Sequence, residues 1–189
     1  MGTLPLTDAE AILANSRILY DASTVEKALD IWAKSVQSKL LECDLPCVAL
    51  VVLKGGMLPA SWLMQRLTLP LTSDYVHASR YRGDTVGREL HWLYQPNIDL
   101  KAQQVLLIDD IFDQGYTLEA VADWCQSKGA EQITTAALVS KKQPGGLPRE
   151  WLDCAALEVP DEYVFGCGMD VYEQWRHLPA IYAYLGPTI

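Results

Sequence analysis

Positively charged residues are scarce in this sequence. It has 15 lysines and arginines against 24 aspartates and glutamates, so the formal net charge is −9 at pH 7. A chain with this balance is not expected to have a general affinity for the phosphates of a nucleic acid. An anionic ligand would have to be held by a local arrangement of backbone amides, a few cations or a metal ion.

Long hydrophobic runs and paired cysteines are missing as well. The longest apolar run, residues 48–53, is far too short to cross a bilayer, and the acidic N-terminal sequence lacks the pattern of a signal peptide. We therefore expect a cytoplasmic protein. The cysteines lack a CxxC spacing, which predicts reduced thiols and argues against a zinc site; they are Cys43, Cys47, Cys125, Cys154 and Cys167.

Apolar strands alternate with amphipathic helices along the chain, whose 189 residues, 50% of them hydrophobic, are typical of one soluble globular domain. The patterns predict helices over residues 8–15, 23–42 and 58–67, and a fourth from residue 118 to just before Gly129. Capping-box spacing places Ser23 and Glu26 at the start of the second helix. Strands are expected over 47–53, 71–78, 90–94, 105–108 and 133–139, with short strands and turns after residue 154. This order favours a mainly parallel α/β sheet with helices on both faces.

Two turns follow buried strands of this expected sheet. Lys54, Gly55 and Gly56 come directly after the strand 47–53, and residues 109–117 come after the strand 105–108. Ligands of such sheets bind beyond the carboxyl ends of the strands. We therefore expect both turns at one site.

The second turn carries three carboxylates, Asp109, Asp110 and Asp113, followed by Gly115 and Thr117 at the start of a helix. Glycine permits a tight turn, and the first helical amides together with a threonine hydroxyl form a site for phosphate. Carboxylates upstream would repel a bare phosphate, but they suit the hydroxyl groups of an attached sugar. The order of the residues indicates a sugar-phosphate site rather than a solvated acidic turn.

Residues 105–117 (VLLIDDIFDQGYT) resemble the phosphoribosyl-diphosphate-binding motif of the type I phosphoribosyltransferases. The chain departs from that motif once, with Gln114 where threonine is usual. The resemblance implies the type I phosphoribosyltransferase fold, a central mainly parallel sheet flanked by helices in a single domain. It places the core at about residues 24–142 and a small hood in residues 1–23 and 143–189.

The C-terminal block, residues 159–176, indicates which enzymes of this family the chain resembles. Residues 159–170 (VPDEYVFGCGMD), followed by Arg176, are similar to the signature of the hypoxanthine-guanine enzymes, and residues 53–56 (LKGG) resemble their diphosphate-binding loop. The resemblance implies a magnesium-dependent transfer of the 5-phosphoribosyl group from 5-phosphoribosyl 1-diphosphate to N9 of hypoxanthine or guanine. The products would be IMP or GMP and diphosphate, and the enzyme would form a homodimer or homotetramer.

The resemblance also implies roles for particular residues. Asp109 and Asp110 would hold the ribose hydroxyls, and Asp113 would act as the base near purine N7. The 5′-phosphate would bind to the turn formed by Asp113, Gln114, Gly115, Tyr116 and Thr117. Lys54 and Gly55 would offer backbone amides to the diphosphate, in a turn that the family often builds with a non-proline cis peptide, and Arg176 would contact the diphosphate.

The purine would be held by residues of the C-terminal block and by a lysine. Tyr163 would stack on the base, the backbone of Val164 would meet its Watson–Crick edge, and Lys141 would donate to O6, with Lys142 as the alternative. Asp170 would lie near the purine edge and a magnesium ion, whose predicted ligands are Asp109, Asp110 and Asp170. Ser79, Arg80 and Tyr81 occupy the position of the family's mobile catalytic loop.

Two other functions fit parts of the sequence. A regulator on the same scaffold would bind structured RNA, although the acidic charge and the purine-type C-terminal block count against it. An aspartyl-phosphate or phosphatase site would use one of the acids after the strand as a nucleophile, but it does not explain the DQGYT segment or the C-terminal block.

Overall fold

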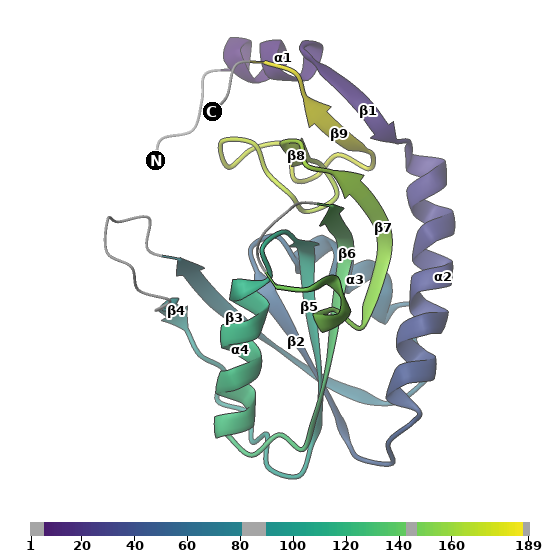
Figure 1. The fold of residues 1–189 in the computed structure, drawn as a ribbon, viewed down its shortest axis with the longest axis vertical. Coiled ribbons are helices and arrows are strands. Elements are labelled where there is room, and N and C mark those ends of the chain that lie inside the picture. Colours follow the sequence, from purple (N-terminus) through teal and green to yellow (C-terminus); the bar gives the residue numbers. More distant parts are fainter. Residues whose placement is uncertain (1–5, 81–89, 143–146, 187–189) are drawn as a thin grey trace.

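The computed structural model describes residues 6–80, 90–142 and 147–186. Its centre is a six-stranded sheet in the order β4-β3-β2-β5-β6-β7 (Figure 1). All neighbouring strands are parallel except the antiparallel pair β3 and β4, which confirms the expected mainly parallel sheet. The strands are β2 (Cys47–Leu53), β3 (Leu71–Arg80), β4 (Leu90–Tyr94), β5 (Gln104–Phe112), β6 (Gln132–Lys142) and β7 (Cys154–Pro160).

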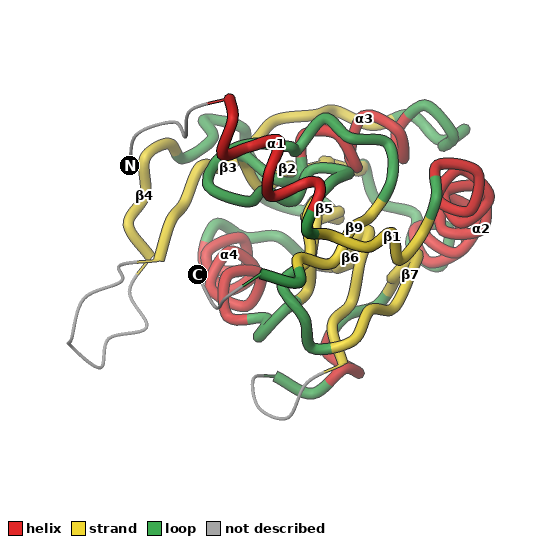
Figure 2. Tube along the Cα trace, turned by 90° about the horizontal axis from the view of Figure 1, so that it is seen from above, coloured by secondary structure: helices red, strands yellow, loops and turns green. Residues whose placement is uncertain are grey.

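Helices cover both faces of this sheet, as Figure 2 shows from above. The helices α2 (Ala22–Leu40) and α3 (Met57–Met64) lie on one face, and α4 (Tyr116–Ser127) lies on the other. Alternate residues of β2 enter two separate cores: Ala49 and Val51 pack in the cluster with α2 and α3, while Val48, Leu50 and Val52 pack in the cluster with α4. Burial on both faces explains why this strand is a continuous apolar run.

A small antiparallel sheet, in the order β1-β9-β8, forms a hood above the carboxyl ends of the parallel strands (Figure 1). It combines β1 (Ser16–Tyr20) with β8 (Val164–Phe165) and β9 (Ile181–Tyr184), and α1 (Leu6–Ala14) packs on it. Residues from the two ends of the chain therefore share one layer. The expected division of the chain into a core and a hood differs from the structure at one element. The strand β7 falls within residues 143–189, which were expected in the hood, yet it is the edge strand of the large sheet.

Several element ends differ from the expected ones. The second helix begins at Ala22 because Asp21, not Ser23, is its N-cap: Asp21 Oδ1 accepts a hydrogen bond of 2.8 Å from the backbone N–H of Thr24. The strands β5 and β6 both run further than the sequence predicts, because they continue to pair up to Phe112 and Ser140. Asp109 and Asp110 therefore lie within a strand, and so does Lys141.

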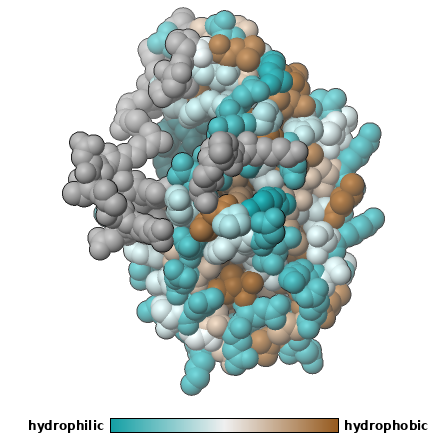
Figure 3. All heavy atoms as spheres, viewed as in Figure 1, coloured by the Kyte–Doolittle hydropathy of each residue, from teal (hydrophilic) through white to brown (hydrophobic). Residues whose placement is uncertain are grey.

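The surface agrees with the acidic composition. The face in Figure 3 is largely hydrophilic, with small scattered hydrophobic patches. No helix in the described part of the chain has the length and apolarity that a membrane crossing needs.

Candidate functional site

Three segments that are distant in the sequence meet at the carboxyl ends of β2 and β5. A Cβ atom on Gly55 would lie 2.0 Å from Asp110 Oδ2, and a Cβ on Gly168 would lie 2.3 Å from the carbonyl oxygen of Gly55. Such contacts are possible only for glycine, and Gly168 also has a left-handed backbone with φ of 107°. The turn after β2, the acids of β5 and the C-terminal block therefore form one site. The Leu53–Lys54 peptide in it is cis, as the resemblance implies.

Asp109 and Asp110 are almost completely buried, each with 8% of its surface exposed. Asp109 Oδ1 accepts a hydrogen bond from the backbone N–H of Asp110, and Asp110 Oδ1 accepts one from the N–H of Ile111. Burial raises the pKa of both carboxyls, and the charge of Asp110 raises that of Asp109 further, while the nearby Arg176 acts in the opposite direction. The protein offsets these two negative charges incompletely, so the pair suits a ligand that brings hydroxyl groups or a cation.

The third predicted metal ligand, Asp170, is engaged elsewhere. Its Oδ1 lies 2.6 Å from Nη2 of Arg176, and its Oδ2 accepts a hydrogen bond from the N–H of Glu173. Within the described residues, no three acidic, histidine or cysteine side chains gather closely enough to hold a metal ion. Magnesium usually keeps several waters and takes further ligands from substrate phosphates, so one or two carboxylates of this set would fit it.

The turn between β5 and α4 has the geometry of an anion site. Gly115 is the N-cap residue of α4 with φ of 82°, and a Cβ there would lie 2.7 Å from the ring of Phe112. The first turn of this 12-residue helix begins at Tyr116, so its backbone amides lie near the end of β5. Gln114, the departure from the family motif, is exposed, and its carbonyl accepts a hydrogen bond of 2.9 Å from Leu147.

Lys141 lies between two carboxylates. Its side chain is 14% exposed, and its Nζ is 3.7 Å from Asp113 Oδ1 and 3.4 Å from Asp161 Oδ1. The parallel pairing of β6 with β7 places Lys141 beside Val159, which brings the start of the C-terminal block next to it. Asp161 was not among the sequence-predicted site residues, although it stands two positions before Tyr163. The alternative cation, Lys142, ends β6, and its side chain is outside the described residues.

The hood positions the predicted base-binding residues. Tyr163 is 43% exposed, and its carbonyl accepts a hydrogen bond of 2.9 Å from the N–H of Tyr184 in β9. Val164 is buried and pairs with Ala183. Of the predicted mobile loop, Tyr81 and the side chains of Ser79 and Arg80 are outside the described residues.

Arg176 and Lys54 form a charged network with the C-terminal block. Lys54 Nζ lies 2.9 Å from Glu173 Oε2, while Arg176 contacts Glu173 at 3.5 Å and donates from Nη1 to the Gly168 carbonyl at 2.9 Å. The hydrogen bond from Lys54 lowers the pKa of Glu173. Arg176 therefore pairs with Glu173, three positions earlier, within a turn. No local pattern signals the contact of Lys54 with Glu173, because 119 positions separate them.

Comparison with known proteins decides the family. The model of the phosphoribosyl transferase domain matches residues 18–174, which is most of the chain. The chain belongs to this family.

Two curated relatives are enzymes of purine chemistry. The hypoxanthine-guanine phosphoribosyltransferase of Staphylococcus epidermidis is 29% identical over 141 residues, 73% of this chain and 77% of the relative. The hypoxanthine phosphoribosyltransferase of Haemophilus influenzae is 28% identical over 145 residues, 75% of this chain and 77% of that protein.

Solved structures agree in fold. A hypoxanthine phosphoribosyltransferase of Trypanosoma cruzi superposes with a TM-score of 0.82 at 21% identity, covering 89% of this chain and 90% of the other. The Staphylococcus aureus hypoxanthine phosphoribosyltransferase gives a TM-score of 0.79 at 25% identity and covers 92% and 94%.

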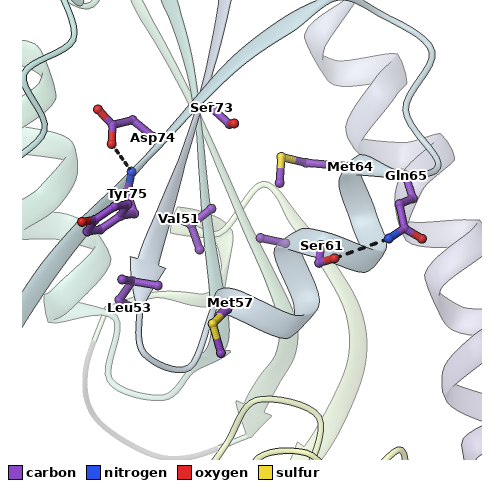
Figure 4. A pocket seen from close by; sticks show the side chains of 10 residues that line it. Val51, Leu53, Met57, Ser61, Met64, Gln65, Ser73, Asp74 and Tyr75 are labelled. Carbon is purple, nitrogen blue, oxygen red and sulfur yellow. Dashed lines mark hydrogen bonds between the residues drawn. The ribbon is translucent and has the colours of Figure 1, made fainter.

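This phosphoribosyltransferase-family chain also has grooves away from the predicted site residues. A groove of about 770 Å³ lies between α3 and β3, lined mostly by apolar side chains such as Val51, Met57 and Tyr75 (Figure 4). Among the described residues, those predicted to bind substrate do not line this groove. This groove is therefore separate from the described residues that are predicted to bind substrate.

Proposed function

We propose that this protein salvages purines by transferring the 5-phosphoribosyl group from 5-phosphoribosyl 1-diphosphate to N9 of hypoxanthine or guanine, with IMP or GMP and diphosphate as products. The observation that carries the proposal is the largely buried side chain of Lys141, whose ammonium lies beside Asp113. A lysine ammonium donates hydrogen bonds and accepts none, so it suits the O6 carbonyl of a 6-oxopurine and not the amino group of adenine. The names of the curated relatives support the same substrates.

Asp113 is the group that we assign to proton chemistry. It lies just past the end of β5, and its carboxylate is about half exposed, so an entering base has access to it. As N9 forms its bond to the anomeric carbon and the diphosphate leaves, a carboxylate here takes or shares the proton at N7. Lys141 at O6 and Asp113 at N7 would then hold adjacent atoms of one purine edge.

The remaining residues bind and orient the substrate. Asp109 and Asp110 hold the ribose hydroxyls, and the backbone amides of Lys54 and Gly55 bind the diphosphate together with Arg176. The 5′-phosphate lies on the amides at the start of α4, with Gln114, Gly115, Tyr116 and Thr117 around it. Carboxylates from the set Asp109, Asp110 and Asp170 would hold a magnesium ion, which would supply positive charge at the diphosphate.

The base is held from the hood side. Tyr163 stacks on the purine, the backbone of Val164 meets its Watson–Crick edge, and Asp170 lies near that edge. Ser79, Arg80 and Tyr81 belong to a lid that excludes water from the reactive sugar. We also propose a homodimer or homotetramer in the cytoplasm, which size-exclusion chromatography with light scattering and cell fractionation would test.

One activity panel tests the proposal. The purified protein is incubated with 5-phosphoribosyl 1-diphosphate and hypoxanthine, guanine, xanthine, adenine or uracil, each with magnesium chloride and with a chelator. We expect magnesium-dependent formation of IMP and GMP. Efficient use of adenine would refute the role of Lys141, and inactivity with all five bases, together with salt-sensitive binding to a structured RNA, would favour the regulator.

A further inference from the structure

One carboxylate, that of Glu173, lies between the two cations of the diphosphate site. Its Oε2 is 2.9 Å from Lys54 Nζ and 3.5 Å from Arg176 Nη2. The backbone of Lys54 and the side chain of Arg176 are the groups assigned above to the leaving diphosphate. Glu173 contacts the guanidinium of Arg176 and the side-chain ammonium of Lys54, whose backbone is the other assigned group, so its carboxylate occupies a position that would suit an anion.

The backbone at Glu173 has an unusual conformation. Its φ is 64°, in the left-handed region that residues other than glycine rarely adopt, and Tyr172 and Trp175 have φ of 50° and 65°. The Glu173 N–H donates to Asp170 Oδ2 at 2.9 Å, which ties this turn to Asp170. Unusual backbone conformations of this kind cluster at ligand sites, where surrounding contacts hold them.

We propose that Glu173 is a resident anion of the diphosphate site, which pairs with Lys54 and Arg176 in the free protein and competes with the diphosphate for them. This inference rests on the proposed function. Arg176 keeps two other partners, Asp170 Oδ1 at 2.6 Å and the Gly168 carbonyl at 2.9 Å, so it stays in place when Glu173 withdraws. Glu173 and the Lys54 side chain are about half exposed and free to swing aside. The competition weakens diphosphate binding and so speeds release of this product.

Binding of inorganic diphosphate to the full chain tests the competition. Isothermal titration at a fixed magnesium chloride concentration compares the wild type with Glu173→Gln, which keeps the shape of the side chain and removes its charge. We expect the variant to bind diphosphate roughly two- to fivefold more tightly, the range that one exposed ion pair supports. Glu173→Ala repeats the test and should also bind more tightly.

Glu26→Gln is the matched control. Glu26 lies on α2, away from the site, and is paired with Arg66, so the substitution makes the same change of charge and also removes a contact with an arginine. Diphosphate binding by this variant should equal that of the wild type. An equal increase in diphosphate affinity in Glu26→Gln and Glu173→Gln would mean that the net charge alone is responsible, and would overturn the inference.

A double substitution separates competition from a merely structural role. In a Lys54→Met background, one of the two cations for which Glu173 and the diphosphate compete is absent. The increase in diphosphate affinity caused by Glu173→Gln should therefore be smaller. Unchanged or weaker diphosphate binding by Glu173→Gln, or an undiminished gain in the Lys54→Met background, would overturn the role of Glu173. If the wild type itself neither binds diphosphate nor transfers phosphoribosyl groups, the proposed function fails instead.

Discussion

Substitution of Gly55 by alanine should disable the site and also destabilise the fold. The new Cβ would lie 2.0 Å from Asp110 Oδ2, whereas real contacts of a Cβ essentially never fall below 3.0 Å, so the turn or Asp110 must move by at least 1.0 Å. A displacement of about 1 Å in a catalytic arrangement can cost about 100-fold in rate, or about 2.7 kcal/mol. We expect kcat/KM for 5-phosphoribosyl 1-diphosphate to fall by about this factor.

The same overlap should lower the free energy of unfolding by about 1–3 kcal/mol, the usual range for an overpacked site. Steady-state kinetics with hypoxanthine and urea denaturation measure the two effects separately. Gly129→Ala is the control: Gly129 follows α4 with φ of 91°, but its Cβ would be 3.4 Å from Lys101 Cα, an ordinary contact. That variant should lose about 1–2 kcal/mol of stability and keep its activity. Equal activity of the two variants would refute the packing argument.

Three further substitutions test separate parts of the molecule. Asp113→Asn should slow the chemical step about 10²- to 10⁴-fold with little effect on purine binding, and unchanged single-turnover rates would reject Asp113 as the base. Lys141→Met should reduce kcat/KM for hypoxanthine about 10- to 100-fold and reduce the preference for hypoxanthine over adenine. An unchanged preference would show that Lys141 does not contact the purine. Asp21→Ala should lower Tm at pH 7 by about 2–4 °C, and Ser23→Ala by less. The Thr24 N–H lowers the pKa of Asp21, so this stabilisation is complete above the ordinary value of 3.8 and disappears as the pH falls through the lower folded-state pKa. A Tm difference that persists in strong acid would contradict the capping role.

The ends of secondary-structure elements depended on contacts that one segment alone does not reveal. Asp21 and Ser23 are both good N-cap residues. Asp21 is the one that caps α2, because β1 ends at Tyr20 and the helix begins directly after the turn there. Similarly, β6 reaches Lys142 because it pairs with β7. Acids and lysines are poor strand formers on their own, so the apolar pattern predicted that β5 and β6 would stop earlier.

The sequence by itself determined the fold class, the strand Cys47–Leu53 to the residue, and the two segments after buried strands that the structure brings together. These features are local: burial on both faces demands a continuous apolar run, and a tight turn before a helix demands glycine. Only the tertiary structure decided which charges meet. Asp161 reaches Lys141, and Glu173 reaches Lys54, because strand pairing and the C-terminal block bring distant segments together. Side-chain pairing across such separations depends on the packed geometry of the whole chain.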